Sequence, residues 1–401
     1  MRSIDDLAVS GQRVLVRADL NVPMDGLRIA DDGKIRAALP TVKALLARGA
    51  GVIVCSHLGR PGGRPEPALS LAPVADRLGQ LLNRPVELAA SPAGPAAAAV
   101  AGSLHPGAVA VLENLRFSPG ETSSDDAERA AFASQLAALA GQYVGDAFGA
   151  VHRRHASVAE LPGLLPHAAG YLVQAEIAAL QRLTQRAERP YVVVLGGAKA
   201  AGKLPVLEHL LGLADEILIG GAVTATFLAA LGWPAGRSRQ DGDLAVARTI
   251  LDQAGARLVL PPDLVVAASP AEPQTALVVA SGAIPSGQML LDIGPRAAQL
   301  YVARIAAART VFWNGPMGVA EVPRFAAGTR AVASAIVRNR AFTVIGGGDT
   351  GAAVRAFGYP ASLFSHVSTG GGASLEFLAG RELPGLVALD HGVPATAIHG
   401  R

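Results

Sequence analysis

Lysine, cysteine and long apolar runs are scarce in this chain of 401 residues. Only four of its 35 basic residues are lysines, at positions 34, 43, 199 and 203, so each lysine is a candidate for a specific role. The lone cysteine, Cys55, cannot form an internal disulfide, which favours a reducing compartment. The formal net charge is only +3 and the basic residues are scattered, which argues against nucleic-acid binding.

No stretch of the sequence is long and apolar enough to predict a membrane span. The alanine-rich segment SPAGPAAAAVAG is short and broken by Pro and Gly. The N-terminal MRSIDDLAVSG carries acidic residues and lacks the apolar core of a signal peptide. We therefore expect a cytoplasmic protein with no membrane partner.

Short apolar runs rich in β-branched residues alternate with helix-like segments along the chain, which predicts parallel sheets built from βαβ units. A chain of 401 residues is also long for one core. We predict an α/β fold of two Rossmann-like domains, joined by an interdomain helix and a hinge. The predicted parts are an N-terminal domain 1–170, the helix 171–190, a C-terminal domain 191–378, and a tail 379–401 that the pattern alone does not place. The predicted strand runs are 13–20, 51–58, 108–115, 142–148, 191–197, 216–221, 275–280, 310–315 and 342–349.

Basic side chains follow the predicted strands of the first half. Ligands of parallel α/β sheets bind beyond the carboxyl ends of strands, and guanidinium groups pair well with phosphate and carboxylate. Among 31 arginines any single one could be an unrelated surface residue, but several at successive strand ends favour a site for a small, doubly anionic substrate. These residues are Arg17, His57, Arg60, Arg116, His152, Arg153 and His155.

Glycine-rich loops follow the strands of the second half, in LGGAK, LIGGA, FWNGPMG, VIGGGDTG and HVSTGGGAS. Glycine lets backbone N–H groups approach phosphate closely, so these loops together predict a nucleotide site. One of them, LGGAKAAGKL, has P-loop spacing from Gly197 to Lys203. The next residue is Leu204, however, which lacks the hydroxyl that holds Mg²⁺ in a P-loop.

The loop with Gly346, Gly348 and Gly351 fits the dinucleotide pattern G-x-G-x-x-G. Asp349 inside it would repel a pyrophosphate unless a cation lay between them, and Mg²⁺ binds through one or two carboxylates plus phosphate oxygens. We therefore interpret Asp349 as a ligand of a metal-nucleotide, and rank a helix-capping role next and an oxidoreductase last. An anionic-substrate domain and a metal-nucleotide domain together predict phosphoryl transfer.

The motifs VRADLNVP, SHLGRP, LENLRF, DAFGAVHRRHAS, LGGAK, LDIGP, WNGPMGV, GGGDT and HVSTGGGASLEFL resemble the phosphoglycerate kinase family, in order and along nearly the whole chain. The resemblance implies phosphoryl transfer between 1,3-bisphosphoglycerate and Mg-ADP, giving 3-phosphoglycerate and Mg-ATP. It also implies a monomer whose two domains close about a hinge and whose C-terminal tail packs on the first domain.

The resemblance further implies the residues of each site. The substrate would contact Asp19, Leu20, Asn21, Lys34, His57, Leu58, Gly59, Arg60, Arg116 and Arg153. The nucleotide would contact Lys199, Lys203, Gly220, Gly221, Asn314, Pro316, Glu321, Gly347, Gly348, Asp349 and Thr350, with Asp349 on Mg²⁺. The groups acting on the transferring phosphoryl would be Lys34, Lys199, and the backbone of Gly371 and Gly372 within the 370–372 loop.

Several features depart from the family pattern, among them GGAVTATF at 220–227, where the family has G-G-G-M-A-Y-T-F. The family expects arginine at Lys34, and lysine keeps the charge but loses the planar fork. A shift of register would instead place Arg36 there, but the flanking Ile35 and the AALP match favour Lys34. Gly202 replaces an acid, so the P-loop spacing is accidental, and Ala320 replaces a phenylalanine. We favour an ordinary phosphoglycerate kinase over a slow or diverged paralogue with another carboxylate substrate, and over a non-catalytic binding protein.

Overall fold

The computed structural model describes residues 1–391 and divides the chain into two compact units. Unit 1 comprises Met1–Ile177 and the segment that starts at Glu382, and unit 2 comprises Ala178–Arg381. Helix α5, Tyr171–Gln185, contains residues of both units. The end of the predicted tail, 392–401, lies outside the described residues. Within the described part of the chain, no helix combines the length and hydropathy that crossing a membrane requires.

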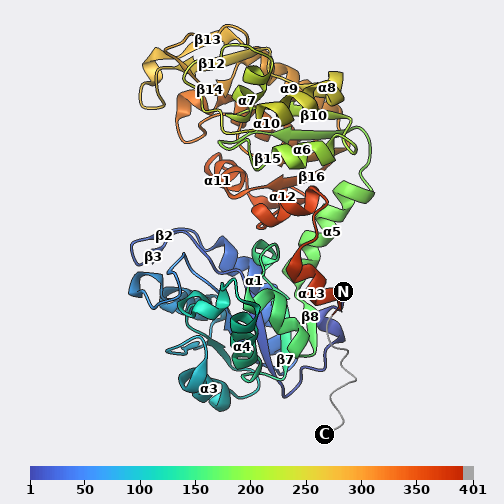
Figure 1. The fold of residues 1–401 in the computed structure, drawn as a ribbon. Helices are drawn as coiled ribbons and strands as arrows, with labels where there is room; N and C mark the ends of the chain where they lie inside the picture. The colour runs from blue at the N-terminus through green and yellow to red at the C-terminus, as the bar shows by residue number, and fades with distance from the viewer. Residues whose placement is uncertain (392–401) are drawn as a thin grey trace. The chain divides into compact units, whose positions relative to one another are not determined.

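Unit 1, whose residues 1–177 run from blue to green in Figure 1, is built on a parallel sheet of six strands in the order β5-β6-β4-β1-β7-β8. These strands are β1 (Arg13–Ala18), β4 (Gly51–Cys55), β5 (Glu87–Leu88), β6 (Val109–Val111), β7 (Gln142–Asp146) and β8 (His167–Ala169). A hairpin of β2 (Met24–Asp25) and β3 (Arg28–Ile29) follows β1. The helices are α1 (Gly33–Ala47), α2 (Ala72–Leu82), α3 (Gly94–Ser103), α4 (Asp126–Ala137) and α13 (Pro384–His391).

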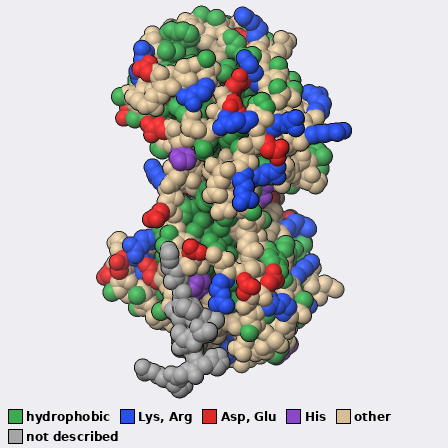
Figure 2. Space-filling view, turned by 90° about the vertical axis from the view of Figure 1, so that its right-hand side faces the viewer, with side chains coloured by type: hydrophobic (Ala, Val, Ile, Leu, Met, Phe, Trp, Pro, Cys, Tyr) green, Lys and Arg blue, Asp and Glu red, His purple; other side chains and the backbone are tan. Residues whose placement is uncertain are grey.

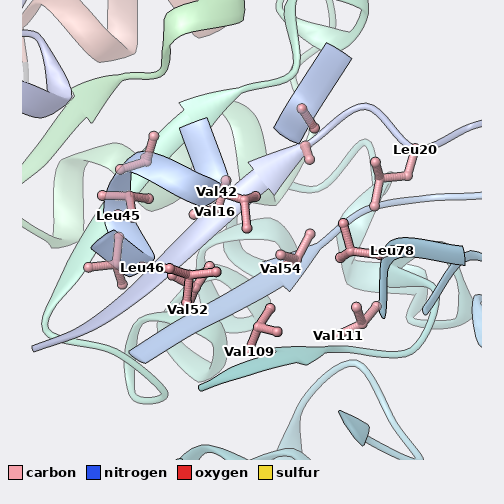
Figure 3. Close-up of a cluster of buried hydrophobic side chains, with 14 of the residues drawn as sticks. Val16, Leu20, Val42, Leu45, Leu46, Val52, Val54, Leu78, Val109 and Val111 are labelled. Carbon is pink, nitrogen blue, oxygen red and sulfur yellow. The ribbon is translucent and has the colours of Figure 1, made fainter. Parts of the chain in front are cut away.

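Alternate residues of the unit 1 strands enter one hydrophobic core with α1 and α2 (Figure 3). Val52 and Val54 of β4 face this core, as do Val109 and Val111 of β6, and all four are at most 3% exposed. Ile53, between the first two, is also fully buried, so the strand is covered on both faces. Each buried side chain of this size contributes roughly 1.5–3 kcal/mol.

Helix α13 packs within unit 1, against β8 and the π-helical turn η6, Ala156–Glu160. The N–H of Gly385 donates to the carbonyl of Val151 at 2.8 Å, and the amino group of Met1 lies 2.8 Å from Asp390. Gly145 leaves room for Leu389, because a Cβ there would lie 2.9 Å from Cδ1 of that side chain.

Unit 2, which runs from green to red in Figure 1, repeats the architecture with a second parallel sheet of six strands, in the order β11-β10-β9-β15-β16-β17. Its strands are β9 (Tyr191–Leu195), β10 (Glu216–Ile219), β11 (Leu258–Val259), β15 (Thr310–Asn314), β16 (Phe342–Gly346) and β17 (His366–Val367). Its helices are α6 (Leu204–Leu210), α7 (Val223–Ala230), α8 (Leu244–Ala254), α9 (Pro295–Ala307), α10 (Ala327–Arg338), α11 (Gly348–Ala356) and α12 (Gly372–Leu378). The predicted α/β fold of two parallel sheets flanked by helices is confirmed.

The run 275–280 differs from the other predicted strands. It forms β13 (Leu277–Ala280), an edge strand of a small antiparallel sheet with β12 (Asp263–Ala267) and β14 (Met289–Ile293). Leu277 and Val278 are 51% and 56% exposed. The apolar composition of the run 275–280 predicts a buried strand, but a short apolar run alone does not distinguish a central strand from an exposed edge strand.

Candidate active site

The carboxyl ends of β1 and β4 meet at one edge of the unit 1 sheet, because these two strands pair in parallel with Arg17 opposite Cys55. The loops that follow are tied together. Ser56 Oγ accepts from the N–H of Leu20 at 2.8 Å, and Asn21 Oδ1 accepts from the N–H of Gly59 at 3.0 Å. The loops after β1 and β4 are therefore held together by these hydrogen bonds.

Lys34, in the first turn of α1, faces this edge. Its Nζ lies 2.8 Å from Oδ2 of Asp19, whose side chain is 4% exposed. Arg36 points elsewhere, since its Nε bonds Oδ1 of Asp32 at 2.8 Å and more than half of its side chain is exposed. The structure thus places Lys34 at the edge and Arg36 on the helix surface.

Arg116 is half-buried beside the Gly59 loop. Its Nη1 donates to the carbonyl of Gly59 at 2.6 Å, while its buried Nε has no hydrogen-bond partner among residues 1–391. Burial, and then the nearby Arg17 and Arg153, lower the pKa of Arg116 to about 10. The group stays charged at neutral pH but is held among other cations, an arrangement that an anionic ligand would stabilise.

The histidines of this edge are buried. His57 is 7% exposed and His155 is 8% exposed. Burial, followed by the charge of Arg17, sets the pKa of His57 well below its ordinary value and that of His155 at about 3. His152 also bears on the pKa of His155, so it lies in the same group of residues.

The remaining predicted substrate residues differ in what they can offer. Arg60 and Arg153 are exposed, and both lie close enough to Arg116 to lower its pKa. The side chains of Leu20 and Leu58 are buried, so only their backbone is available to a ligand. Gly59 has φ 61°, and a Cβ there would lie 2.6 Å from Cδ2 of Leu69.

In unit 2, three glycine loops at the strand ends pack backbone to backbone. The N–H of Gly197 donates to the carbonyl of Pro316 at 2.7 Å, and the N–H of Gly221 donates to the carbonyl of Met317 at 2.9 Å. Gly221 has φ 58°, and a Cβ there would lie 2.5 Å from the nitrogen of Gly197. These glycines therefore allow the loops to approach one another, a reason that the sequence reading did not consider.

A cavity of about 220 Å³ lies against these loops. One part of its wall is apolar, from Leu290, Leu291 and Val319. The rest includes four of the predicted nucleotide residues, Gly221, Pro316, Glu321 and Asp349. An apolar wall with a few polar groups suits a purine base and its ribose.

Lys203 precedes helix α6 and is largely buried near this cavity. Its Nζ lies 2.9 Å from the position that a Cβ of Gly197 would take. Burial lowers the pKa of Lys203, and the charges of Asp349 and Asp241 oppose that shift. Lys203 and Asp349 therefore interact electrostatically, whereas Lys199 is exposed.

Asn314 ends strand β15 with an unsatisfied side chain. It is 3% exposed, and its buried Nδ2 has no hydrogen-bond partner in the part of the chain that the structure describes. This atom lies 3.0 Å from where a Cβ of Gly346 would be, at the start of the loop that leads to Asp349. Thr350 differs, because its buried hydroxyl accepts from the N–H of Gly315 at 2.7 Å; a contact from Thr350 to a ligand would come from its backbone.

The loop 370–372 starts helix α12, with Gly371 at φ 53° as the residue before it. Among the described residues, the space at Gly371 and Gly348 is empty: no atom lies within 4 Å of a Cβ built at either one. Gly347, at φ 86°, similarly precedes α11. Gly220 is buried, and a Cβ there would lie 2.5 Å from Sδ of Met317.

Within residues 1–391 there is no group of three or more His, Cys, Asp or Glu residues that could hold a metal ion. Asp349 is exposed in the first turn of α11 and lines the cavity. Mg²⁺ commonly binds to one or two carboxylates and completes its shell with phosphate oxygens and water. The residues present therefore fit a cation that arrives with a nucleotide.

The sequence reading missed residues on both units. Glu121 and Ser157 lie beneath the histidines of unit 1 and bond to each other, with 2.7 Å between Ser157 Oγ and Glu121 Oε1. Neither ends a strand, so strand-end reasoning gave no signal for them, although Ser157 is the last residue of the quoted motif DAFGAVHRRHAS. Leu290 and Leu291 line the cavity of unit 2. Leu291 is the first residue of the quoted motif LDIGP and Leu290 precedes it, which was the available signal.

Comparisons with known proteins agree with this arrangement. The sequence profile described as "Phosphoglycerate kinase" matches residues 4–381. Phosphoglycerate kinases of Streptomyces avermitilis and Frankia alni are 56% and 57% identical, each over 97% of this chain and 100% of theirs. The solved phosphoglycerate kinase of Pyrococcus horikoshii OT3 is 33% identical with a TM-score of 0.87, over 97% of this chain and 98% of its own. That of Coxiella burnetii is 36% identical with a TM-score of 0.84 and the same coverage. The motif resemblance is thereby confirmed, and this chain belongs to the phosphoglycerate kinase family.

Proposed function

We propose the residue roles through which this chain, a phosphotransferase whose acceptor is a carboxyl group, acts on its substrates. The reaction is reversible phosphoryl transfer between 1,3-bisphosphoglycerate and ADP, giving 3-phosphoglycerate and ATP. The observation that carries the assignment is the concentration of positive charge around Arg116, whose pKa is lowered by burial and by Arg17 and Arg153.

Unit 1 would bind the phosphoglycerate. Arg60, Arg116 and Arg153 would take its phosphate, because guanidinium groups match the geometry of phosphate oxygens. Asp19 and Asn21, on the loop after β1, would accept and donate hydrogen bonds at the glycerate end. Lys34 would lie closest to the reacting carboxylate, held there by its ion pair with Asp19.

Unit 2 would bind the nucleotide. The apolar wall would take the base, Glu321 the ribose, and Lys203 with the backbone of Gly347 and Gly348 the phosphates. Asn314 Nδ2 would find in the nucleotide the acceptor that it lacks among the described residues.

Asp349 would hold Mg²⁺, which would neutralise phosphate charge and orient the phosphoryl group. The carboxylate oxygen of 3-phosphoglycerate would attack the γ-phosphorus, and the bond from phosphorus to the β-γ bridging oxygen would break with ADP as the leaving group. Lys34, Lys199, and the N–H groups of Gly371 and Gly372 would stabilise the charge on the phosphoryl group in flight.

Water must be excluded while the phosphoryl group moves, so we propose that the two units close about a hinge during each turnover. We also propose that the chain acts as a monomer in the cytoplasm. On the face drawn in Figure 2, Lys and Arg side chains are interspersed with Asp and Glu, so that face gives no broad basic field for nucleic acid.

The roles are tested by two substitutions with opposite expectations. Arg116→Met should raise KM for 3-phosphoglycerate by about tenfold or more and leave KM for ATP unchanged, because a charge-assisted hydrogen bond contributes about 1.5–3 kcal/mol. Lys203→Met should do the reverse. Arg84→Met removes a surface arginine that bonds the Gly107 carbonyl at 2.6 Å and serves as the matched control. Equal changes in both KM values for either variant would refute the division of roles.

A further inference from the structure

Arg17 forms a hydrogen bond with a ring nitrogen of His57. Its Nη2 lies 3.0 Å from Nδ1 of His57, and both side chains are buried. A guanidinium group has donors only, so Nδ1 must accept. In a neutral imidazole the proton then resides on Nε2. Within residues 1–391 the structure gives the His57 ring no other hydrogen bond, which leaves its Nε2–H for a ligand.

The position of Arg17 is fixed by its other contacts. Arg17 is 1% exposed; its Nε donates to Ser157 Oγ at 2.9 Å and its Nη1 to the carbonyl of Ala18 at 2.6 Å. Ser157 is held in turn by Glu121, which accepts from its hydroxyl at 2.7 Å and its N–H at 3.0 Å. Tyr143 donates to the carbonyl of Ser157 at 2.8 Å.

The positive charge of Arg17 is balanced by the carboxylate of Glu121. Glu121 is fully buried, and its Oε1 lies 4.0 Å from Nη2 of Arg17. Both oxygens of Glu121 accept from Ser157, and Oε1 also lies 3.8 Å from Nδ1 of His155. A buried ion pair that is bridged by a hydroxyl resists displacement, because breaking it would leave an uncompensated charge.

The surroundings of His57 disfavour a second proton on its ring. The groups that face it are Arg17 from β1, Arg116 from the turn after β6, His155 from the residue before η6, and Lys34 from α1. Together with burial they set the pKa of His57 well below its ordinary value. A proton on Nδ1 would also place two donors and two positive charges 3.0 Å apart.

We propose that Arg17, anchored by Ser157 and Glu121, is a positioning residue that holds His57 as the neutral tautomer protonated at Nε2. The ring then gives the substrate one uncharged hydrogen-bond donor of fixed direction, while the arginines supply the charge. This inference rests on the proposed function, in which His57 contacts the phosphoglycerate. It also defines a specificity: at this position the site accepts a bare anionic oxygen and rejects a hydroxyl or protonated phosphate oxygen that presents its hydrogen to the ring.

The tautomer can be measured in the wild-type full chain, without any substitution of Arg17. Long-range ¹H–¹⁵N correlation spectra of the ¹⁵N-labelled protein distinguish the two neutral tautomers and the charged ring, and a His57→Gln spectrum assigns the resonance among the nine histidines. We expect a neutral ring protonated at Nε2 from pH 6 to 8. A ring protonated at Nδ1, or a charged ring, overturns the proposal.

Addition of 3-phosphoglycerate separates this inference from the proposed function. A shift of the His57 Nε2–H resonance with the tautomer retained supports both. If the tautomer is as expected but saturating 3-phosphoglycerate leaves that resonance unmoved, the substrate role of His57 is wrong, and the proposal that Arg17 positions it for substrate falls with it.

A double variant tests whether Arg17 determines the tautomer of His57. Arg17→Met alone would leave Glu121 uncompensated, so we choose the double variant Arg17→Met/Glu121→Gln, which removes both buried charges. We expect its His57 to show a mixture of tautomers, and KM for 3-phosphoglycerate to rise about tenfold with kcat and KM for ATP little changed.

Arg48→Met is the matched control, because Arg48 also donates to backbone carbonyls, those of Ile4 and Leu7, and is not among the groups that face His57. It should change neither the tautomer nor KM. If the double variant does not fold, Ser157→Ala, which removes the acceptor of Arg17 Nε, takes its place with the same expectation. A folded variant of either kind that keeps the wild-type tautomer contradicts the role of Arg17.

Discussion

Lys34 Nζ lies 2.8 Å from Asp19 Oδ2, with 31% of the lysine side chain exposed and the aspartate almost fully buried. This ion pair orients Lys34, the residue that stands where the family pattern has an arginine. A lysine engaged in this way presents its remaining donors as a point charge, whereas an arginine would present a planar fork.

We predict that Lys34→Arg raises kcat for phosphoryl transfer, because a guanidinium could bond Asp19 and a substrate oxygen at the same time. The measurement is steady-state kinetics with both substrates saturating. Arg36→Lys is the control on the same helix, since Arg36 pairs with Asp32 away from the edge, and it should leave kcat unchanged. A Lys34→Arg rate equal to or below wild type would show that the site has adapted to lysine.

We predict that Asp349→Asn increases the Mg²⁺ concentration for half-maximal activity by about tenfold or more, because one charged ligand of the ion is lost. A Mg²⁺ titration at fixed ATP measures it. Asp252→Asn, which changes an exposed carboxylate 3.5 Å from Arg248 on α8, should leave the titration unchanged. The metal role of Asp349 is wrong if its variant needs no more Mg²⁺ than the wild type.

We predict that Asn314→Leu stabilises the ligand-free protein while weakening its affinity for ATP. The buried Nδ2 has no hydrogen-bond partner within the described residues, and such a group costs about 1–3 kcal/mol. Leucine is of similar size and removes that cost, but it cannot bond a nucleotide. Without ATP, the variant should have a higher thermal unfolding midpoint than the wild type. Adding ATP should raise the midpoint of the variant by less than it raises that of the wild type. A lower midpoint in the ligand-free state would contradict the unsatisfied amide.

We predict a pH-dependent loss of stability that originates at Asp146. Burial raises the pKa of this carboxyl to about 7 from the usual 3.8, and hydrogen bonds from the Thr41 side chain and from the N–H groups of Val173 and Leu172 only partly oppose the shift. The unfolded chain therefore releases this proton at lower pH than the folded chain. Stability is full below about pH 4 and is lost as pH rises to about 7, by up to about 4 kcal/mol.

Asp146→Asn should remove that dependence and retain the acceptor Oδ1 for the N–H of Leu172, at 2.9 Å. Urea unfolding followed by circular dichroism at pH 5 and pH 8 measures it. Both tryptophans, Trp233 and Trp313, belong to unit 2, so their fluorescence follows the unfolding of that unit and shows whether the pH effect is confined to unit 1. A variant with the same pH dependence as the wild type would refute the assignment.

The parallel sheets could be predicted because buried central strands are continuous apolar runs, as in YVVVL and GVIVC. Strand-end reasoning also directed attention to His57, Arg116 and Asp349. It could not reveal that the Arg17 guanidinium lies beneath the edge, since a strand pattern gives the face of a residue but not the partners of a long side chain.

Other features depended on contacts between distant segments. Glu121 reaches Ser157 across 36 positions of sequence, and Thr350 reaches Gly315 across 35. Local spacing carries no signal for such pairs. The glycines at 197 and 221 were read as phosphate contacts, yet close packing of their own loops requires them as well.

The most direct test of the account is the steady-state rate of the full chain with 3-phosphoglycerate and Mg-ATP, measured together with the binding of each ligand by calorimetry. The account predicts saturable formation of 1,3-bisphosphoglycerate and ADP in equal amounts, with no product when Mg²⁺ is chelated. Binding of both ligands without any product would contradict it and leave only a ligand-binding protein.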